Sequence, residues 1–145
     1  MDVVYHELVN YLCESFKTTP RIKFQMDLEP VELDISLAMP IGMILNEAIT
    51  NSVKYAFPGQ REGIINISIK KAGENRLLFS VADNGIGLPH ALDINKVNSL
   101  GMKLMKGLSD DIAARFSIKN KQGTEITIEF KTDKSLQSQR NIPGN

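Results

Sequence analysis

The sequence predicts an α+β fold, a two-layer α/β sandwich in which one mixed, mostly antiparallel sheet lies under a layer of helices. Three observations lead to this prediction. Hydrophobic residues recur with the period of a helix in some stretches and alternate with polar residues, as in a strand, in others. Several strand-like stretches are joined in pairs by short turns, which is typical of antiparallel hairpins. Helical stretches stand between these hairpins, so the two kinds of element should share one core.

The first part of the chain is expected to form a helix and a strand. Residues 3–16 have the spacing of an amphipathic helix that packs on something larger. The expected apolar face of this helix consists of Val4, Leu8, Tyr11, Leu12 and Phe16. Residues 22–28 alternate apolar and polar side chains, the period of a half-buried strand, and Pro30 ends the pattern. Val31 and Leu33 can add a short strand after it.

The longest helix is predicted from about Ser36 to Ala56, where the helical period returns. Pro40 fits such a helix only near the first turn, because proline lacks the N–H that later turns require. Pro58 and Gly59 directly follow and close the segment. We therefore expect one helix over this whole stretch.

The second half of the chain should supply two hairpins and one more helix. Residues 64–71 and 76–83 alternate as strands and are joined by the turn-forming AGEN. After NGIGLP and a polar stretch, a helix is expected from a cap at Ser99 to about Ala114. ARFSIKN and GTEITIEFK then form a closing hairpin around residues 121–123.

Length, charge and cysteine content restrict the class of protein. A chain of 145 residues fits one domain, assigned to residues 1–132, with a flexible tail over 133–145 that has little to bury. Its 17 Lys and Arg balance 17 Asp and Glu, which leaves no basic field for nucleic acid or a membrane surface. The longest nearly apolar run, residues 37–45, is too short to cross a bilayer. The single cysteine, Cys13, cannot form an internal disulfide, so a reducing cytoplasm is expected.

The long helix should present two opposite faces. The apolar face consists of Leu45, Ala48, Ile49, Ser52 and Ala56. The opposite face gathers Glu47, Asn51, Lys54 and Tyr55. A carboxylate, a carboxamide, an ammonium and an aromatic ring could together hold a magnesium ion, a phosphate chain and a flat base. Taken alone, the pattern favours an ordinary solvated helix surface.

An acidic residue continues the apolar side of a predicted strand. Alternation places Asp83 on the same side as Phe79 and Val81. Burying a carboxylate is costly without hydrogen-bond partners, so such a residue usually meets the amides of a turn or a ligand. Gly85 and Gly87 follow directly and let the backbone bend and a ligand approach. An Asp-Asn-Gly turn without any function would have the same sequence.

The start of the third predicted helix follows a segment poor in apolar residues, LPHALDINKVN, which suits a mobile lid. Ser99 and Gly101 stand where the first amides of the helix are unpaired and favour an anion such as phosphate. Lys103 could add positive charge. An ordinary surface loop before a well-capped helix remains the alternative.

Four stretches are informative together; in order, they are NEAITNSVKYAF, VADNGIGLP, SLGMKLMKGLSDDI and GTEITIEF. Together they resemble the Bergerat-type ATP-binding fold of histidine kinases, gyrase, mismatch-repair clamps and heat-shock chaperones. The likeness extends over roughly residues 3–131. Within this group, the chain resembles most the histidine kinases with a compact lid.

The resemblance implies roles for individual residues. Asn51 would bind magnesium through its amide oxygen, and Asp83 would accept a hydrogen bond from the adenine amino group. Lys54 would meet phosphate and Tyr55 would pack against the base. Thr124 would support adenine through water; alternation places it on one strand face with Ile126, Ile128 and Phe130.

The remaining positions concern the lid and the reaction. The resemblance implies that Gly85, Gly87 and Gly101 admit the nucleotide and hinge the lid, and that Ser99 occupies a place often held by glycine. Glu47 resembles the carboxylate that activates water in the related ATPases, so it could polarise a nucleophile here too.

The implied reaction is transfer of the γ-phosphoryl group of ATP, bound with Mg²⁺, to a histidine on a separate dimerisation domain. A response regulator would act downstream, and the parent kinase would be a cytoplasmic or membrane-attached homodimer. His6, on the first helix, is expected to be a surface residue and His90 a lid residue, neither of them the acceptor. Three alternatives stay open: an ATPase clamp or chaperone, a serine kinase of the anti-sigma type, and a non-catalytic module that binds nucleotide or a partner protein.

Overall fold

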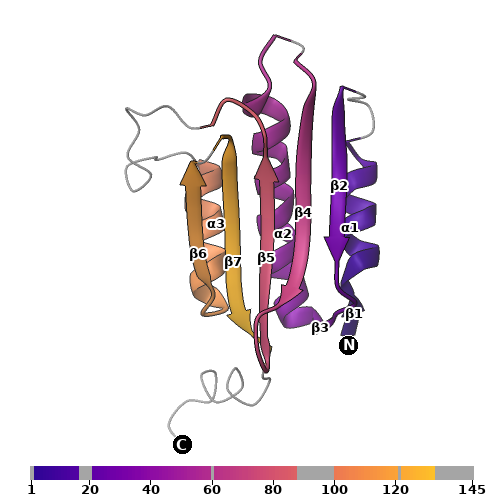
Figure 1. Cartoon of the computed structure of the whole chain (residues 1–145). Coiled ribbons are helices and arrows are strands. Elements are labelled where there is room, and N and C mark those ends of the chain that lie inside the picture. The colour runs from indigo at the N-terminus through magenta and orange to yellow at the C-terminus, as the bar shows by residue number, and fades with distance from the viewer. Residues whose placement is uncertain (1, 17–20, 60, 88–99, 121, 133–145) are drawn as a thin grey trace, which may run out of the picture.

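The main sheet of the protein has the predicted mixed, mostly antiparallel arrangement. The computed structural model describes residues 2–16, 21–59, 61–87, 100–120 and 122–132. Within them, five strands lie in the order β2–β4–β5–β7–β6, and only β2 and β4 are parallel (Figure 1). The strands are β2 (Ile22–Leu28), β4 (Gly63–Lys71), β5 (Arg76–Asp83), β6 (Arg115–Asn120) and β7 (Thr124–Lys131). Both predicted hairpins, β4–β5 and β6–β7, are confirmed.

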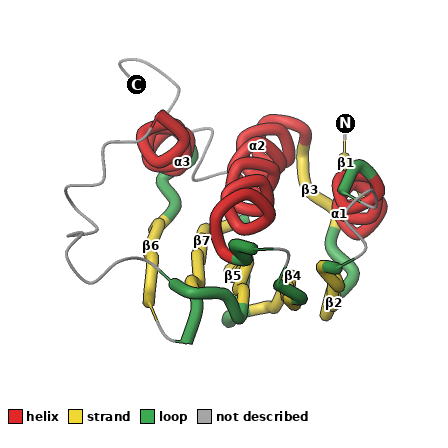
Figure 2. Tube along the Cα trace, turned by 90° about the horizontal axis from the view of Figure 1, so that it is seen from above, coloured by secondary structure: helices red, strands yellow, loops and turns green. Residues whose placement is uncertain are grey.

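Helices cover one face of this sheet, which confirms the two-layer fold class. They are α1 (Tyr5–Glu14), α2 (Ile35–Asn51), which continues into η1 (Ser52–Ala56), and α3 (Leu100–Asp111). Seen from above, α2 lies over the middle of the sheet, with α1 and α3 on opposite sides of it (Figure 2). The parallel pair β2–β4 needs a crossover connection, and α2 forms it.

The core lies between the two layers. Ile65, Ile67 and Phe79 of the sheet are at most 1% exposed, as are Ile41 and Leu45 of α2. Removing this apolar surface from water is the main stabilising contribution to such a fold. Opposite the helices, the sheet carries hydrogen-bonded hydroxyl pairs, Ser68 with Ser80 and Ser117 with Thr127, as expected of a face turned to solvent.

The first predicted helix differs from the structure at its start and in its buried face. Asp2–Val4 forms strand β1, which pairs with β3 (Glu32–Asp34), the short strand expected after Pro30. The helix therefore begins only at Tyr5, because the backbone before it is engaged in strand pairing. Its buried residues are Tyr5, Val9 and Cys13. The prediction that Val4 and Tyr11 belong to the buried face was wrong: Val4 lies in β1 and Tyr11 is 75% exposed.

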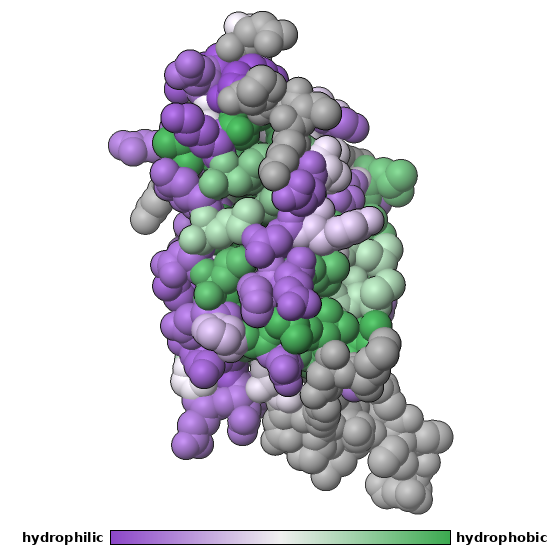
Figure 3. All heavy atoms as spheres, turned by 90° about the vertical axis from the view of Figure 1, so that its right-hand side faces the viewer, coloured by the Kyte–Doolittle hydropathy of each residue, from purple (hydrophilic) through white to green (hydrophobic). Residues whose placement is uncertain are grey.

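The side of the molecule that carries α1 and the edge strand β2 mixes apolar with polar surface (Figure 3). Met26 lies on the expected apolar side of β2 but is 39% exposed. An edge strand has a neighbour on one side only, so its alternation produces weaker burial than in β4 or β5.

The long helix begins close to the predicted residue but differs from a single α-helix at its end. It starts at Ile35, next to the predicted Ser36, and Pro40 is its sixth residue, near the first turn. The last five residues form the π-helix η1 instead of α-helix. A π-turn is wider than an α-turn. It occurs mostly as a single turn within an α-helix, frequently at a functional site. Here the Ala56 carbonyl at its end accepts a hydrogen bond from the Ile86 amide at 3.0 Å.

Three predicted segments lie wholly or partly outside the described residues: the lid up to Ser99, the turn at Lys121 and the tail over 133–145. In the part of the chain that the structure describes, no helix has the length and apolar character needed to span a membrane.

Candidate functional site

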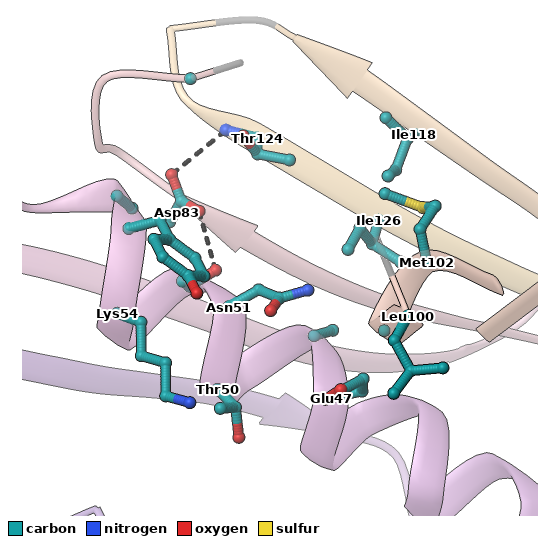
Figure 4. Close-up of a pocket in the computed structure, with 16 residues that line it drawn as sticks. Glu47, Thr50, Asn51, Lys54, Asp83, Leu100, Met102, Ile118, Thr124 and Ile126 are labelled. Carbon is teal, nitrogen blue, oxygen red and sulfur yellow. Dashed lines mark hydrogen bonds between the residues drawn. The ribbon is translucent and has the colours of Figure 1, made fainter. Parts of the chain in front are cut away.

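A cavity of about 490 Å³ lies between α2, η1 and α3 on one side and strands β5, β6 and β7 on the other (Figure 4). Its described lining consists of Glu47, Ala48, Thr50, Asn51, Ser52, Lys54, Tyr55, Ala56, Asp83, Gly87, Leu100, Gly101, Met102, Ile118, Thr124 and Ile126. Its volume suits a small organic ligand, and its lining mixes an apolar wall with a few convergent polar groups, as ligand sites do.

Asp83 is the one charged residue among the described residues whose side chain is buried, with 8% exposure. Its Oδ1 accepts hydrogen bonds from the backbone amides of Gly85 at 3.0 Å and Thr124 at 3.1 Å. Its Oδ2 accepts one from the Ser52 hydroxyl at 2.8 Å. Since a carboxylate oxygen can accept two hydrogen bonds, Oδ1 is saturated and Oδ2 keeps one lone pair for a donor in the cavity.

Two glycines allow the backbone to gather around Asp83. Gly123 has a φ of +127°, and a Cβ there would lie 2.0 Å from the Asp83 carbonyl oxygen. The β6–β7 turn can therefore rest against the end of β5, which brings the Thr124 amide to the carboxylate. A Cβ on Gly85 would lie 2.3 Å from the Ala56 carbonyl oxygen, so the turn after Asp83 packs tightly on η1.

The helical side of the cavity carries the polar residues of the long helix. Glu47 and Asn51 are one turn apart on α2 and both line the cavity, with Thr50 and Lys54 beside them (Figure 4). A Cβ on Gly101 would lie 2.8 Å from the Glu47 Oε1 atom, so this carboxylate stands against the first turn of α3.

These side chains fit a magnesium ion that arrives with a phosphate ligand. Among the described residues, no three His, Cys, Asp or Glu side chains are grouped closely enough to bind a metal by themselves. Mg²⁺ usually takes one or two protein oxygens and completes its shell with phosphate and water. The Asn51 amide oxygen, with the Glu47 carboxylate one turn away, supplies oxygens of that kind.

One wall of the cavity is apolar. Ile118 of β6, Ile126 of β7 and Met102 of α3 lie close together in it, with Leu100 beside them (Figure 4). Ala48 and Ala56 supply small side chains from the helix. A slot with small and branched walls and a single carboxylate suits a flat heterocycle that carries a hydrogen-bond donor.

Most of the predicted site residues meet at this cavity. They are Glu47, Asn51, Lys54, Tyr55, Asp83, Gly87, Gly101 and Thr124. Gly85 and Lys103 do not line it: Gly85 packs on η1, and Lys103 is exposed on α3. Ser99 lies outside the described residues.

Sequence reasoning missed several lining residues. Thr50, Leu100, Met102 and Ile118 carry no pattern that separates them from ordinary helix or strand positions. Ser52 did carry a signal, because it is a polar residue on the otherwise apolar face of the long helix.

The family model of the histidine kinase-like ATPase domain matches residues 21–130. The chain therefore belongs to this family, as the four motifs predicted. Among curated proteins, the chain is 24% identical over 110 residues to the blue-light-activated histidine kinase 2 of Erythrobacter litoralis, covering 75% of this chain and 32% of the relative. It is 27% identical over 100 residues to the sensor histidine kinase PdtaS of Mycobacterium tuberculosis, covering 66% of this chain and 20% of the relative. The chain thus spans a third or less of the length of these relatives.

Solved structures agree on the fold. A blue-light-activated histidine kinase of Erythrobacter litoralis superposes with a TM-score of 0.83 at 20% identity, covering 97% of this chain and 44% of that one. The nucleotide-free catalytic domain of histidine kinase ThkA superposes with a TM-score of 0.74 at 19% identity, covering 91% and 96% of the two chains. The second match spans almost a whole catalytic domain, so the predicted fold is confirmed.

Proposed function

We propose that this domain binds ATP with Mg²⁺ in the cavity and donates the γ-phosphoryl group to a histidine on a separate segment of a sensor kinase. The observation that carries the proposal is the buried Asp83 carboxylate, which has one lone pair left for a donor in the cavity. Membership of the histidine kinase-like ATPase family supports it.

The base end of the cavity favours adenine over a 6-oxopurine. The adenine amino group donates a hydrogen bond that Asp83 Oδ2 can accept, while the ring fills the slot near Ile126 and Met102. A guanine or hypoxanthine ring would instead point its carbonyl oxygen at the carboxylate, which leaves two acceptors facing each other. Thr124, whose amide fixes Oδ1, places its side chain at the same end of the cavity.

The polar end suits the triphosphate. Asn51 and Glu47 would hold the metal ion, and Lys54 would meet a phosphate oxygen from the next turn. Bound Mg²⁺ neutralises charge on the phosphates and makes the γ-phosphorus easier to attack. The protein contributes by holding the nucleotide in one orientation, which is the main source of catalysis in phosphoryl transfer.

The acceptor histidine should come from outside this chain. During transfer, an imidazole nitrogen forms a bond to the γ-phosphorus while the bond to the β–γ bridging oxygen breaks and ADP leaves. His6 is half-buried on α1, which lies on the opposite side of α2 from α3 (Figure 2), whereas α3 lines the cavity. His90 lies outside the described residues. A kinase of this kind would act as a cytoplasmic homodimer and pass the phosphoryl group to a response regulator.

Two measurements test the proposal. Calorimetric titration should give ATP binding that strengthens with Mg²⁺. Incubation with γ-labelled ATP should leave no acid-labile, base-stable phosphate on this chain alone, whereas addition of the histidine-bearing segment of its parent kinase should label that segment. Stoichiometric labelling of His6 in the chain alone would contradict the assignment.

A second candidate function, ATP hydrolysis, is favoured by one observation. Glu47 lines the cavity beside Asn51 and stands against Gly101, where it could accept a proton from an attacking water. Steady release of phosphate by the chain alone, lost in Glu47→Ala, would support hydrolysis. Transfer to a histidine without such release would exclude it.

A further inference from the structure

Ser52 is a buried polar residue to which neither the fold nor the four motifs assign a role. It is the first residue of η1, is 8% exposed and lines the cavity. Its hydroxyl donates to Asp83 Oδ2 at 2.8 Å, across 31 positions of sequence. We propose that Ser52 is a positioning residue for base recognition, which holds the Asp83 carboxylate so that its remaining lone pair faces the adenine amino group.

The hydrogen bonds around Asp83 explain why such a residue is needed. The two backbone amides, from Gly85 and Thr124, both bind Oδ1 and leave Oδ2 to be oriented by something else. Ser52 supplies the only donor to Oδ2 among the described residues. With that lone pair occupied, a single direction remains open to the ligand. Hydrogen bonds weaken steeply when they are misaligned, so a fixed direction raises affinity for a donor at one position.

A purely structural role would look different. A serine inside a helix usually bonds back to the carbonyl one turn earlier, as Ser109 does with Met105 at 2.8 Å. Ser52 instead reaches out of η1 to the strand that ends at Asp83. Ser109 is also buried, at 1% exposure, but does not line the cavity. The two residues therefore form a matched pair for experiment.

The inference rests on the proposed adenine site, so the test uses nucleotides that differ at the amino group. ATP and purine riboside triphosphate, which lacks that group, are titrated into the wild-type chain, Ser52→Ala, Asp83→Asn and the double variant. Ser52→Ala should weaken ATP binding by about 5- to 10-fold, the range expected for one well-placed hydrogen bond. Its affinity for purine riboside triphosphate should stay within about 2-fold of wild type, because no donor then needs the oriented lone pair.

The double variant tests whether Ser52 affects ATP binding through the Asp83 carboxylate. If Ser52 acts through the carboxylate, Ser52→Ala should change ATP affinity by less than about 2-fold in the Asp83→Asn background. Ser109→Ala should leave ATP affinity at the wild-type value. Binding of purine riboside triphosphate by Ser52→Ala shows that the cavity is still formed.

Several outcomes would overturn the inference. They are an unchanged ATP affinity in Ser52→Ala, an equal loss for both nucleotides, the same loss in the Asp83→Asn background, and a Ser52→Ala chain that no longer folds. If the proposed function itself were wrong, the titrations would give another result. The wild-type chain would then not bind ATP, or Asp83→Asn would bind ATP as well as the wild type does.

Discussion

The Asp83→Asn substitution should exchange an acceptor for a donor at one defined atom. In the wild type, Oδ1 accepts hydrogen bonds from the backbone amides of Gly85 at 3.0 Å and Thr124 at 3.1 Å. A carboxamide has one oxygen, and only the orientation that places this oxygen at Oδ1 keeps both bonds. Its NH₂ group then occupies the place of Oδ2, where the Ser52 hydroxyl can turn to accept from it. The fold should therefore survive while the group that faces the ligand changes character.

The magnitude follows from that exchange. With ATP, the adenine amino group would face another donor, so a hydrogen bond is lost and a buried polar group is left without its partner. Such losses cost about 1–3 kcal/mol, which corresponds to roughly 5- to 150-fold weaker binding. With ITP, whose 6-oxo group is an acceptor, the same NH₂ gains a partner. The ITP affinity should rise while the ATP affinity falls.

Calorimetry with both nucleotides measures this effect, with thermal unfolding as a check of the fold. Asp111→Asn is the matched control, because it removes the same charge from an exposed position of α3 that does not line the cavity. Equal losses for ATP and ITP, or an unchanged ATP affinity, would refute the assignment of Asp83 to the base.

Three further predictions concern other parts of the structure. Asn51→Ala should abolish the magnesium dependence of ATP binding but leave ADP binding without metal nearly unchanged in calorimetry; a uniform loss with and without Mg²⁺ would indicate damaged folding instead. Gly85→Ala should lower the free energy of unfolding in urea by about 1–3 kcal/mol, since its Cβ would meet the Ala56 carbonyl oxygen at 2.3 Å, whereas Gly107→Ala, with nothing within 4 Å, should not lower it. Burial raises the pKa of the Cys13 thiol from its usual 9.0 to about 11, so the unfolded chain ionises first and stability should fall as pH rises between these values. Urea titrations over that range should show a smaller fall in Cys13→Ala, and equal profiles would contradict this cause.

The main strands and most of the residues that meet at the cavity could be predicted because the relevant pattern is local. Strands β4 and β5 are buried on alternate residues, and alternation alone placed Asp83 with Phe79 and Val81. Helical periodicity likewise put Glu47, Asn51 and Lys54 on one side of the long helix, and all of them line the cavity. Such periodicities arise from the geometry of each element and need no knowledge of its neighbours.

Other features could not be predicted because they depend on contacts between distant segments. In the first helix, the stripe of Val4, Leu8 and Leu12 and that of Tyr5, Val9 and Cys13 have the same spacing. The second stripe is the one that is buried. Its burial accompanies the pairing of β1 with β3 and a hydrogen bond that the Tyr5 hydroxyl donates to the Ala38 carbonyl at 3.2 Å.

The sequence by itself therefore determined three features: the order of the main strands and helices along the chain, the polar face of the long helix, and a carboxylate on a buried strand face. Each of them follows from residues near one another in the chain. The tertiary structure alone decided that the helix ends in a π-turn, that Gly85 packs on it and that Ser52 reaches Asp83. The physical reason is that a hydrogen bond or a close contact depends on positions in space to within a fraction of an ångström. Packing of the two layers sets those positions, and no local pattern encodes them.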